Sequence, residues 1–151
     1  MQLMLRKEKR MTDTTIVKTV IFAASRETVW EFLTQKEKLA IWFHPAEEDL
    51  SLNKDYALLD TNADGEIERV CWGSVLEMEH PSKLTYTFTV KPLNGHMTTV
   101  SWKLEETHGG TKLTLTHKGF EGAGDNLIGL FMALDAGWDK HFAKFREAMT
   151  A

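Results

Sequence analysis

The sequence predicts an α+β fold in which an antiparallel sheet packs against one long C-terminal helix. Apolar residues recur every three or four positions through Asp125–Met149, which is the spacing of a single stripe on an α-helix. Apolar and polar residues alternate between positions 70 and 118, as in strands with one buried face and one exposed face. Turn-forming segments such as His80–Lys83 separate these runs, which makes consecutive strands antiparallel neighbours.

The chain begins with a basic segment, and we expect residues 1–13 to be a loosely ordered extension. Its charges, Arg6, Lys7, Lys9 and Arg10, are not followed by the apolar run of a signal peptide, and Met11 offers a second start. The length of 151 residues then predicts a single domain over residues 14–151.

The first structured elements are predicted to be a strand and two short helices. Thr15–Phe22 is rich in β-branched residues, and its apolar side chains at both parities predict burial on both faces or a strong twist. Ser25 is a suitable N-cap for the first helix. The second helix begins near Thr34 and ends at His44–Pro45, because the residue before a proline disfavours helical backbone.

Five further runs are predicted to complete the sheet. In the second of them, Trp72 shares the more apolar parity, so we expect Trp72 to point inward and Cys71 to face the other side. The five runs are Tyr56–Leu59, Val70–Glu79, Leu84–Val90, Thr98–Glu105 and 112–118.

The final helix, with Asp125 as its expected N-cap, is the only predicted element long enough to cover the apolar face of the sheet. Aromatic side chains from the sheet and from the helix predict a ligand cavity between them, most of all under the first half of the helix. The alternative is a core that these side chains fill completely. Trp42, just before a turn, is expected at the cavity mouth. The candidate cavity residues are Trp42, Phe43, Trp72, Tyr86, Phe88, Trp102, His117, Phe131, Leu134 and Trp138.

Three motifs have competing interpretations. His117 shares the inward parity of its strand and could orient a ligand, but a strand-end histidine touching solvent is the favoured interpretation. Asp60–Glu68 matches the first half of a calcium-binding EF-hand loop, yet Cys71 stands where that loop needs a glutamate, so a hairpin turn is favoured. Glu47–Asp49 is interpreted as a solvated acidic run, and the alternative is a charged contact for a partner.

Composition excludes several classes of function. The net charge of −4 argues against a nucleic-acid partner, and no apolar run reaches the roughly 18 residues of a membrane span. The single Cys71 fits a cytoplasmic location. The six histidines lack metal-binding spacing, and no nucleophile elbow or phosphate loop is present, so no catalytic residue, metal or cofactor is predicted.

Six segments of the chain, taken together and in order, resemble one known family. The segments are Phe22–Trp30, Leu39–Pro45, Gly73–Pro81, Leu84–Tyr86, His117–Phe120 and Gly137–Phe142. They resemble the group named after the C-terminal domain of the activator of the Hsp90 ATPase, within the START-like, Bet v 1-like superfamily.

The resemblance implies a helix-grip fold, in which about seven antiparallel strands curve around the C-terminal helix and two short helices follow the first strand. Members of the superfamily bind apolar small molecules, act as cyclases or hydrolases, or contact chaperones. Our first hypothesis is therefore a cytoplasmic protein, monomer or homodimer, that binds an apolar or amphipathic small molecule without a cofactor, with Tyr86 and His117 as orienting groups. The alternatives are a chaperone-binding module of the stress response, and a cyclase or hydrolase with an acid or base in the cavity.

Overall fold

The computed structural model describes residues 15–124 and 126–150. Six antiparallel strands in this part of the chain form one sheet in the order β1-β6-β5-β4-β3-β2. The strands are β1 (Ile16–Phe22), β2 (Asp55–Thr61), β3 (Ile67–Glu79), β4 (Lys83–Val90), β5 (Thr98–Thr107) and β6 (Gly110–Lys118). The helices are α2 (Arg26–Thr34), α3 (Lys36–Trp42) and α4 (Leu127–Thr150), with a single 3₁₀ turn, η1 (Lys91–Leu93), between β4 and β5.

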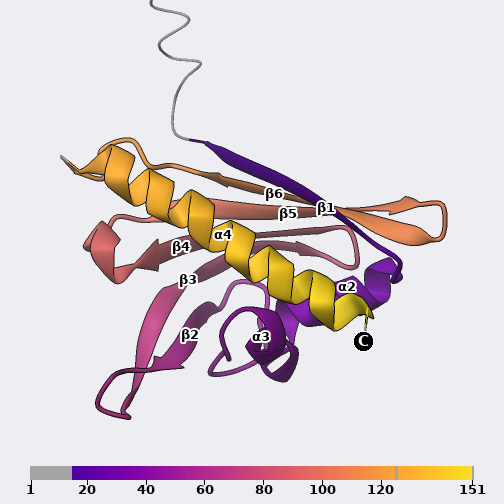
Figure 1. Ribbon diagram of the computed structural model, residues 1–151, viewed down its shortest axis with the longest axis horizontal. Helices are drawn as coiled ribbons and strands as arrows, with labels where there is room; N and C mark the ends of the chain where they lie inside the picture. Colours follow the sequence, from indigo (N-terminus) through magenta and orange to yellow (C-terminus); the bar gives the residue numbers. More distant parts are fainter. Residues whose placement is uncertain (1–14, 125, 151) are drawn as a thin grey trace, which may run out of the picture.

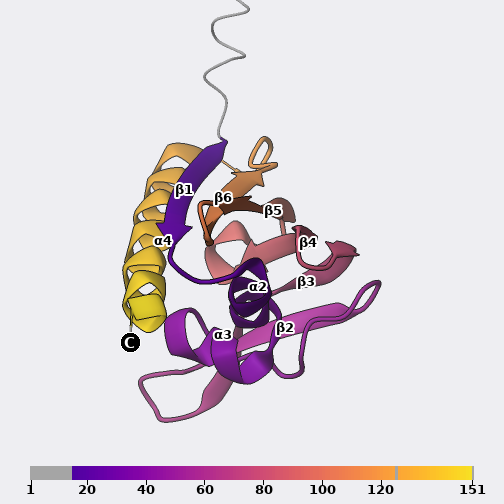
Figure 2. The same cartoon turned by 90° about the vertical axis from the view of Figure 1, so that its right-hand side faces the viewer.

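Helix α4 runs diagonally across one face of the sheet, and α2 and α3 close the end near its C-terminus (Figure 1). Seen from the side, the sheet curves from β1, beside α4, round to β2, beside α3 (Figure 2). The predicted α+β class and the long covering helix are confirmed. The predicted N-cap of α4, Asp125, lies outside the described residues.

The described part of the chain has six strands, as many as the runs in the sequence, where the family resemblance implies about seven. The segment before β2 makes only one bridge, Ala46 to Leu58, and two backbone hydrogen bonds flank it, Glu47 N to Ala57 O (3.0 Å) and Leu59 N to Pro45 O (2.8 Å). Pro45 has no N–H to donate, so the pairing cannot extend in its direction.

Strand β3 corrects the predicted orientation of Trp72. Cys71 is buried with Val75 on the inner face, while Trp72 is only half-buried at the opposite parity. Register shifts lie at both ends of this stretch, between Leu58 and Leu59 on β2 and between Val75 and Glu77 on β3. A bulge moves every following side chain to the other face, so one parity could not hold along the whole of β3.

On strand β1 one of the two expectations, burial on both faces, is wrong, because only one face is buried. Ile16, Val20 and Phe22 enter the core, whereas Val17 and Ile21 are about 60% exposed on the outer face. Among the described residues, β1 mainly contacts β6, its neighbour in the sheet, and α4 on its inner side, so none of these residues forms a layer over its outer face.

The short helices are capped as their sequences suggest, with one contribution from far along the chain. The Ser25 hydroxyl accepts from Thr28 N (3.2 Å), which confirms Ser25 as the N-cap of α2. The Asp49 carboxylate accepts from Lys36 N (2.8 Å) at the start of α3, and Glu47 pairs with Arg69 through two bonds of 3.0 and 3.1 Å. The acidic run is therefore partly engaged within the fold rather than only solvated.

The β2–β3 connection is the predicted hairpin turn. The Asn62 side-chain oxygen accepts from the backbone N–H of Asp64 (2.9 Å) and Glu66 (3.0 Å), and Gly65 adopts a positive φ of 81°. The turn's own N–H groups thus occupy the oxygen that a calcium loop would offer to the ion.

Candidate functional site

The interior between the sheet and α4 has a closed region and an open one. The closed region is an aromatic stack around Trp42, whose ring lies 4.3 Å from that of Phe145 and 6.0 Å from that of Trp102, centroid to centroid. Trp42 is 1% exposed and donates its Nε1–H to Phe32 O (2.8 Å). Trp42 therefore belongs to the filled core, and its predicted place at a cavity mouth is wrong.

The open region is a cavity of about 100 Å³ between β3, β4, the segment after α3 and the middle of α4. We call it the inner cavity. An adjoining hollow of about 310 Å³ shares His44, Cys71 and Val90 with it and continues past Lys91 and Pro92. The lining residues of the inner cavity are Phe43, His44, Cys71, Phe88, Val90, Leu134, Gly137, Trp138 and His141.

Four of the ten predicted cavity residues line this space, namely Phe43, Phe88, Leu134 and Trp138. The other six lie elsewhere. Trp72 is on the outer side of β3, and Phe131 is half-buried nearer the start of α4 with its ring 5.5 Å from that of Phe120. Trp42, Tyr86, Trp102 and His117 are core residues.

Tyr86 and His117, the predicted orienting groups, already have protein partners. The Tyr86 hydroxyl accepts from Trp102 Nε1 (2.9 Å). Trp138 Nε1 donates to His117 Nδ1 (3.0 Å), so the neutral imidazole carries its proton on Nε2 and donates it to Thr98 Oγ1 (2.7 Å). Thr98 in turn donates to Phe88 O (2.6 Å), and the chain of donors and acceptors is complete.

His117 is thus fully buried and structural, and the expectation that it touches solvent is wrong. Burial lowers its pKa to about 3, so the imidazole is neutral at physiological pH. A histidine with both nitrogens engaged and no proton to exchange is not a ligand-orienting group.

The polar groups of the inner cavity are instead His44 and His141, which the sequence analysis did not select. Their ring centroids are 5.3 Å apart, and His44 Nδ1 lies 3.8 Å from the Asp60 carboxylate. His141 Nδ1 is buried and has no hydrogen-bond partner among the described residues. A signal for His141 was present, because it follows Leu134 by seven positions and Trp138 by three, on the buried stripe of α4.

Both histidines are held in the neutral state. Burial lowers the pKa of His44 despite the opposing effect of Asp60. Burial, together with the neighbouring His44, lowers the pKa of His141 to about 4, although a hydrogen bond to the backbone of Trp42 opposes this shift. The nitrogen left without a partner among the described residues is Nδ1. Each neutral ring has one N–H donor and one acceptor nitrogen. The pair can therefore recognise a hydroxyl or carbonyl group.

Cys71, on the cavity wall, is a protonated thiol. Burial raises its pKa to about 12, whereas a nucleophilic cysteine needs a lowered pKa. No group of three His, Cys, Asp or Glu side chains within residues 15–124 and 126–150 is placed to hold a metal ion.

Comparison with known proteins agrees with this architecture. A curved antiparallel sheet around a C-terminal helix, with a cavity between them, defines the helix-grip class of START-like proteins. The family model described as "Activator of Hsp90 ATPase homolog 1-like protein" matches residues 23–150, and the chain belongs to this family. No curated protein matches it.

Solved structures share the fold at low sequence identity. A Mesorhizobium loti protein, MLL2253, is 21% identical with a TM-score of 0.72, over 88% of this chain and 94% of that one. CalU16 from Micromonospora echinospora is 21% identical with a TM-score of 0.68, over 87% and 73%. An HSP90 activator from Plasmodium falciparum is 21% identical with a TM-score of 0.58, over 70% and 72%.

Proposed function

We propose that the protein binds a small apolar or amphipathic molecule in the inner cavity. The ligand's apolar part packs against Phe43, Phe88 and Trp138, and its hydrogen-bonding group meets His141. The unpartnered His141 Nδ1 is the observation that carries this proposal. An unsatisfied buried polar atom costs about 1–3 kcal/mol, and a ligand that bonds it recovers that cost.

The dimensions of the two adjoining spaces limit the ligand. An apolar cavity of about 150 Å³ can hold benzene, so the inner cavity of about 100 Å³ takes part of a ring beside His141, and the adjoining hollow of about 310 Å³ takes the rest. The larger hollow beyond His44 has room for the remainder of the molecule, and Lys91 at its rim can meet a polar end. An apolar cavity that leads to a polar rim suits an amphipathic ligand.

The protonation states favour binding over acid–base catalysis. A general base works best when its pKa is near the operating pH. The pKa of His141, about 4, is far below neutrality, and Cys71 is held as a thiol. The cyclase or hydrolase hypothesis therefore has weaker support in this site.

Fluorine NMR with 4-fluorophenol and fluorobenzene tests the proposal, because only the phenol can hydrogen-bond to His141. A lost hydrogen bond of about 1–3 kcal/mol corresponds to roughly 5- to 150-fold in affinity, so we expect 4-fluorophenol to bind at least five-fold more tightly. Absence of saturable binding by both probes would count against the inner cavity as a binding site.

Gly137 offers a variant that fills the cavity. A Cβ built on Gly137 meets no atom within 4 Å, so Gly137→Leu enters open space beside the ligand. Ala136→Leu, one residue earlier on the exposed side of α4, is the matched control. We expect Gly137→Leu to weaken binding of 4-fluorophenol at least ten-fold and the control to leave it unchanged; equal effects of the two variants would contradict the site.

A second candidate function is contact with an Hsp90-type chaperone in the cytoplasm, as part of the stress response. Membership of the Hsp90-activator-like family supports it, and the lone Cys71 suits a reducing compartment. Measuring the ATPase rate of purified Hsp90 with and without this protein distinguishes the two candidates. An increased rate that Gly137→Leu does not alter would favour the chaperone role over the cavity.

A further inference from the structure

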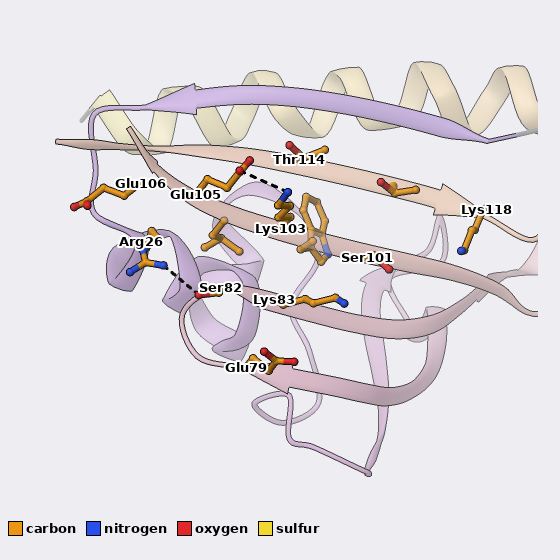
Figure 3. Close-up of a pocket in the computed structure, with 13 residues that line it drawn as sticks. Arg26, Glu79, Ser82, Lys83, Ser101, Lys103, Glu105, Glu106, Thr114 and Lys118 are labelled. Carbon is orange, nitrogen blue, oxygen red and sulfur yellow. Dashed lines mark hydrogen bonds and ion pairs between the residues drawn. The ribbon is translucent and has the colours of Figure 1, made fainter. Parts of the chain in front are cut away.

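A groove of about 820 Å³ lies on the face of the sheet that points away from α4. It crosses β4, β5 and β6, and most of the residues that line it have outward-facing side chains (Figure 3). We call it the outer groove. Its charged residues are four cations, Arg26, Lys83, Lys103 and Lys118, and three carboxylates, Glu79, Glu105 and Glu106. It is distinct from the inner cavity, which lies on the other side of the sheet.

Two lysines face each other at the centre of the outer groove. Lys83 on β4 is the direct partner of Lys103 on β5 in the antiparallel register. Directly opposed residues have Cβ atoms about 4.5–5.5 Å apart, and like charges in that position are unfavourable. An anion between the two ammonium groups would remove the repulsion.

The present partners of these lysines hold them only weakly. Lys83 Nζ lies 3.3 Å from Glu77 and Lys103 Nζ lies 3.5 Å from Glu105, and all four side chains are at least a third exposed. Exposed pairs of this kind contribute little to stability, because water screens them and two long side chains lose freedom. Either flexible side chain can therefore turn toward a ligand.

Hydroxyl groups lie next to the lysine pair, and a third lysine lies further along β6. Ser101 lies two residues from Lys103 on the same face and pairs with Thr116 on β6, while Lys103 itself pairs with Thr114. Lys118 has no ion-pair partner among the described residues. Ammonium and hydroxyl groups are the donors that phosphate and carboxylate oxygens accept from.

The charges of the outer groove are unevenly distributed along its length. Figure 3 shows Arg26 and Glu106 at one end, Lys118 at the opposite end, and Lys83 and Ser101 between them. The lining as a whole holds four cations and three carboxylates, which gives a local charge of +1 on a protein whose net charge is −4. Two of the carboxylates, Glu79 and Glu105, lie beside Lys83 and Lys103, whereas Lys118 has none paired with it among the described residues. The field along the part from Lys83 to Lys118 therefore favours an anion.

We infer that the outer groove binds a small anionic molecule that carries a phosphate or carboxylate group. The anionic group lies between Lys83 and Lys103, with Ser101 as a hydroxyl donor. Lys118, four residues beyond Thr114 on β6, adds positive charge further along the groove. The rest of the ligand extends toward Arg26, where the Glu106 carboxylate can pair with a polar or cationic substituent. This site is independent of ligand binding in the inner cavity.

Titration of the ¹⁵N-labelled protein with pyrophosphate and, separately, tricarballylate tests the inference by amide NMR. Ionic strength is held constant with NaCl, because exposed charges are screened by salt. We expect saturable shifts at Ser101, Lys103 and Thr116. Tighter binding of pyrophosphate would assign the site to phosphoryl groups, and tighter binding of tricarballylate to carboxylates.

The double variant Lys83→Gln/Lys103→Gln should weaken binding of the preferred anion at least ten-fold. Lys54→Gln/Lys140→Gln removes the same charge at exposed positions outside the outer groove and should change affinity less than two-fold. Equal loss in both variants, or no saturable shift below 10 mM anion at about 0.1 M salt, would overturn the inference. Binding of a poly-glutamate peptide without binding of either small anion would also overturn it, in favour of an acidic protein partner.

Discussion

Trp138 lies between two histidines that belong to different regions of the interior. Its ring centroid is 5.9 Å from that of His117 and 6.1 Å from that of His141. On the His117 side, Trp138 Nε1, both imidazole nitrogens and the Thr98 hydroxyl are all hydrogen-bonded. On the His141 side, Nδ1 is buried next to an unfilled space and has no hydrogen-bond partner in the part of the chain that the structure describes.

The difference separates a structural polar group from a candidate binding group. A satisfied buried network stabilises one arrangement of the core, whereas a partly satisfied one costs free energy. Proteins retain such a cost where another molecule can recover it, so local imperfection is expected at functional positions. The same residue type therefore has opposite consequences on the two sides of one tryptophan.

Substitution of His117 should change the free energy of unfolding more than any other change proposed for these two histidines. His117→Leu leaves Trp138 Nε1 without an acceptor in a fully buried site, and Thr98 loses one partner. Each orphaned buried group costs about 1–3 kcal/mol, so we expect the free energy of unfolding to fall by roughly 3 kcal/mol. Urea unfolding at pH 7 measures it, and an unchanged m-value shows that the denatured state is unaltered. A loss below about 1 kcal/mol would contradict a stabilising network.

Lowering the pH should also destabilise the folded protein through His117, by a somewhat smaller amount. The pKa of His117 is about 3 in the folded protein against 6.5 for an ordinary histidine, so the unfolded chain binds the proton more tightly. Stability contributed by neutral His117 is therefore complete above pH 6.5 and is lost as the pH falls toward 3. At about 1.4 kcal/mol per pH unit, the loss reaches roughly 2 kcal/mol by pH 5.

His141 contributes to the same loss, because its folded pKa of about 4 also lies below pH 5. Its side chain is only partly buried, so solvent screening reduces its share. Asp60 acts on His44, and Lys144 acts on both His44 and His141. Unfolding measured from pH 7.5 to 5 in the parent and in His117→Leu isolates the His117 contribution. A pH dependence as steep in the variant as in the parent would show that other groups cause it.

Sequence patterns predict the regular parts of this fold and fail where the register changes. The alternation of β4, β5 and β6 correctly orients Phe88, Trp102 and His117, and the stripe of α4 correctly gives Trp138 and Phe145 to the core. These elements have one repeat along their whole length, so one parity or one helical face describes them.

The errors share a tertiary cause. Two register shifts around the middle of β3 reverse the face of Trp72, and neither leaves a signature in local composition. The inner cavity depends on where the segment after α3 meets α4, which brings His44 beside His141 across 97 positions of sequence. Apart from Trp72, the sequence indicates most of the aromatic residues that are buried. The unfilled space between them depends on how the segment after α3 packs against α4, which no local pattern records.

Substitution of His141 should give the smallest change in stability and the opposite sign to that of His117. His141→Leu removes an unsatisfied buried nitrogen and places an apolar side chain against Phe43 and Trp138. The change should raise the free energy of unfolding by up to about 1 kcal/mol. It should also equalise the affinities for 4-fluorophenol and fluorobenzene, because the group that distinguishes them is gone.

The two measurements together separate a binding role of His141 from a structural one. A structural histidine would resemble His117, and its loss would destabilise the protein and weaken both fluorinated probes alike. A binding histidine leaves stability intact while the preference for the phenol disappears. Loss of more than about 1 kcal/mol on His141→Leu would place His141 with His117, and the inner cavity would then have no free polar group with which to orient a ligand.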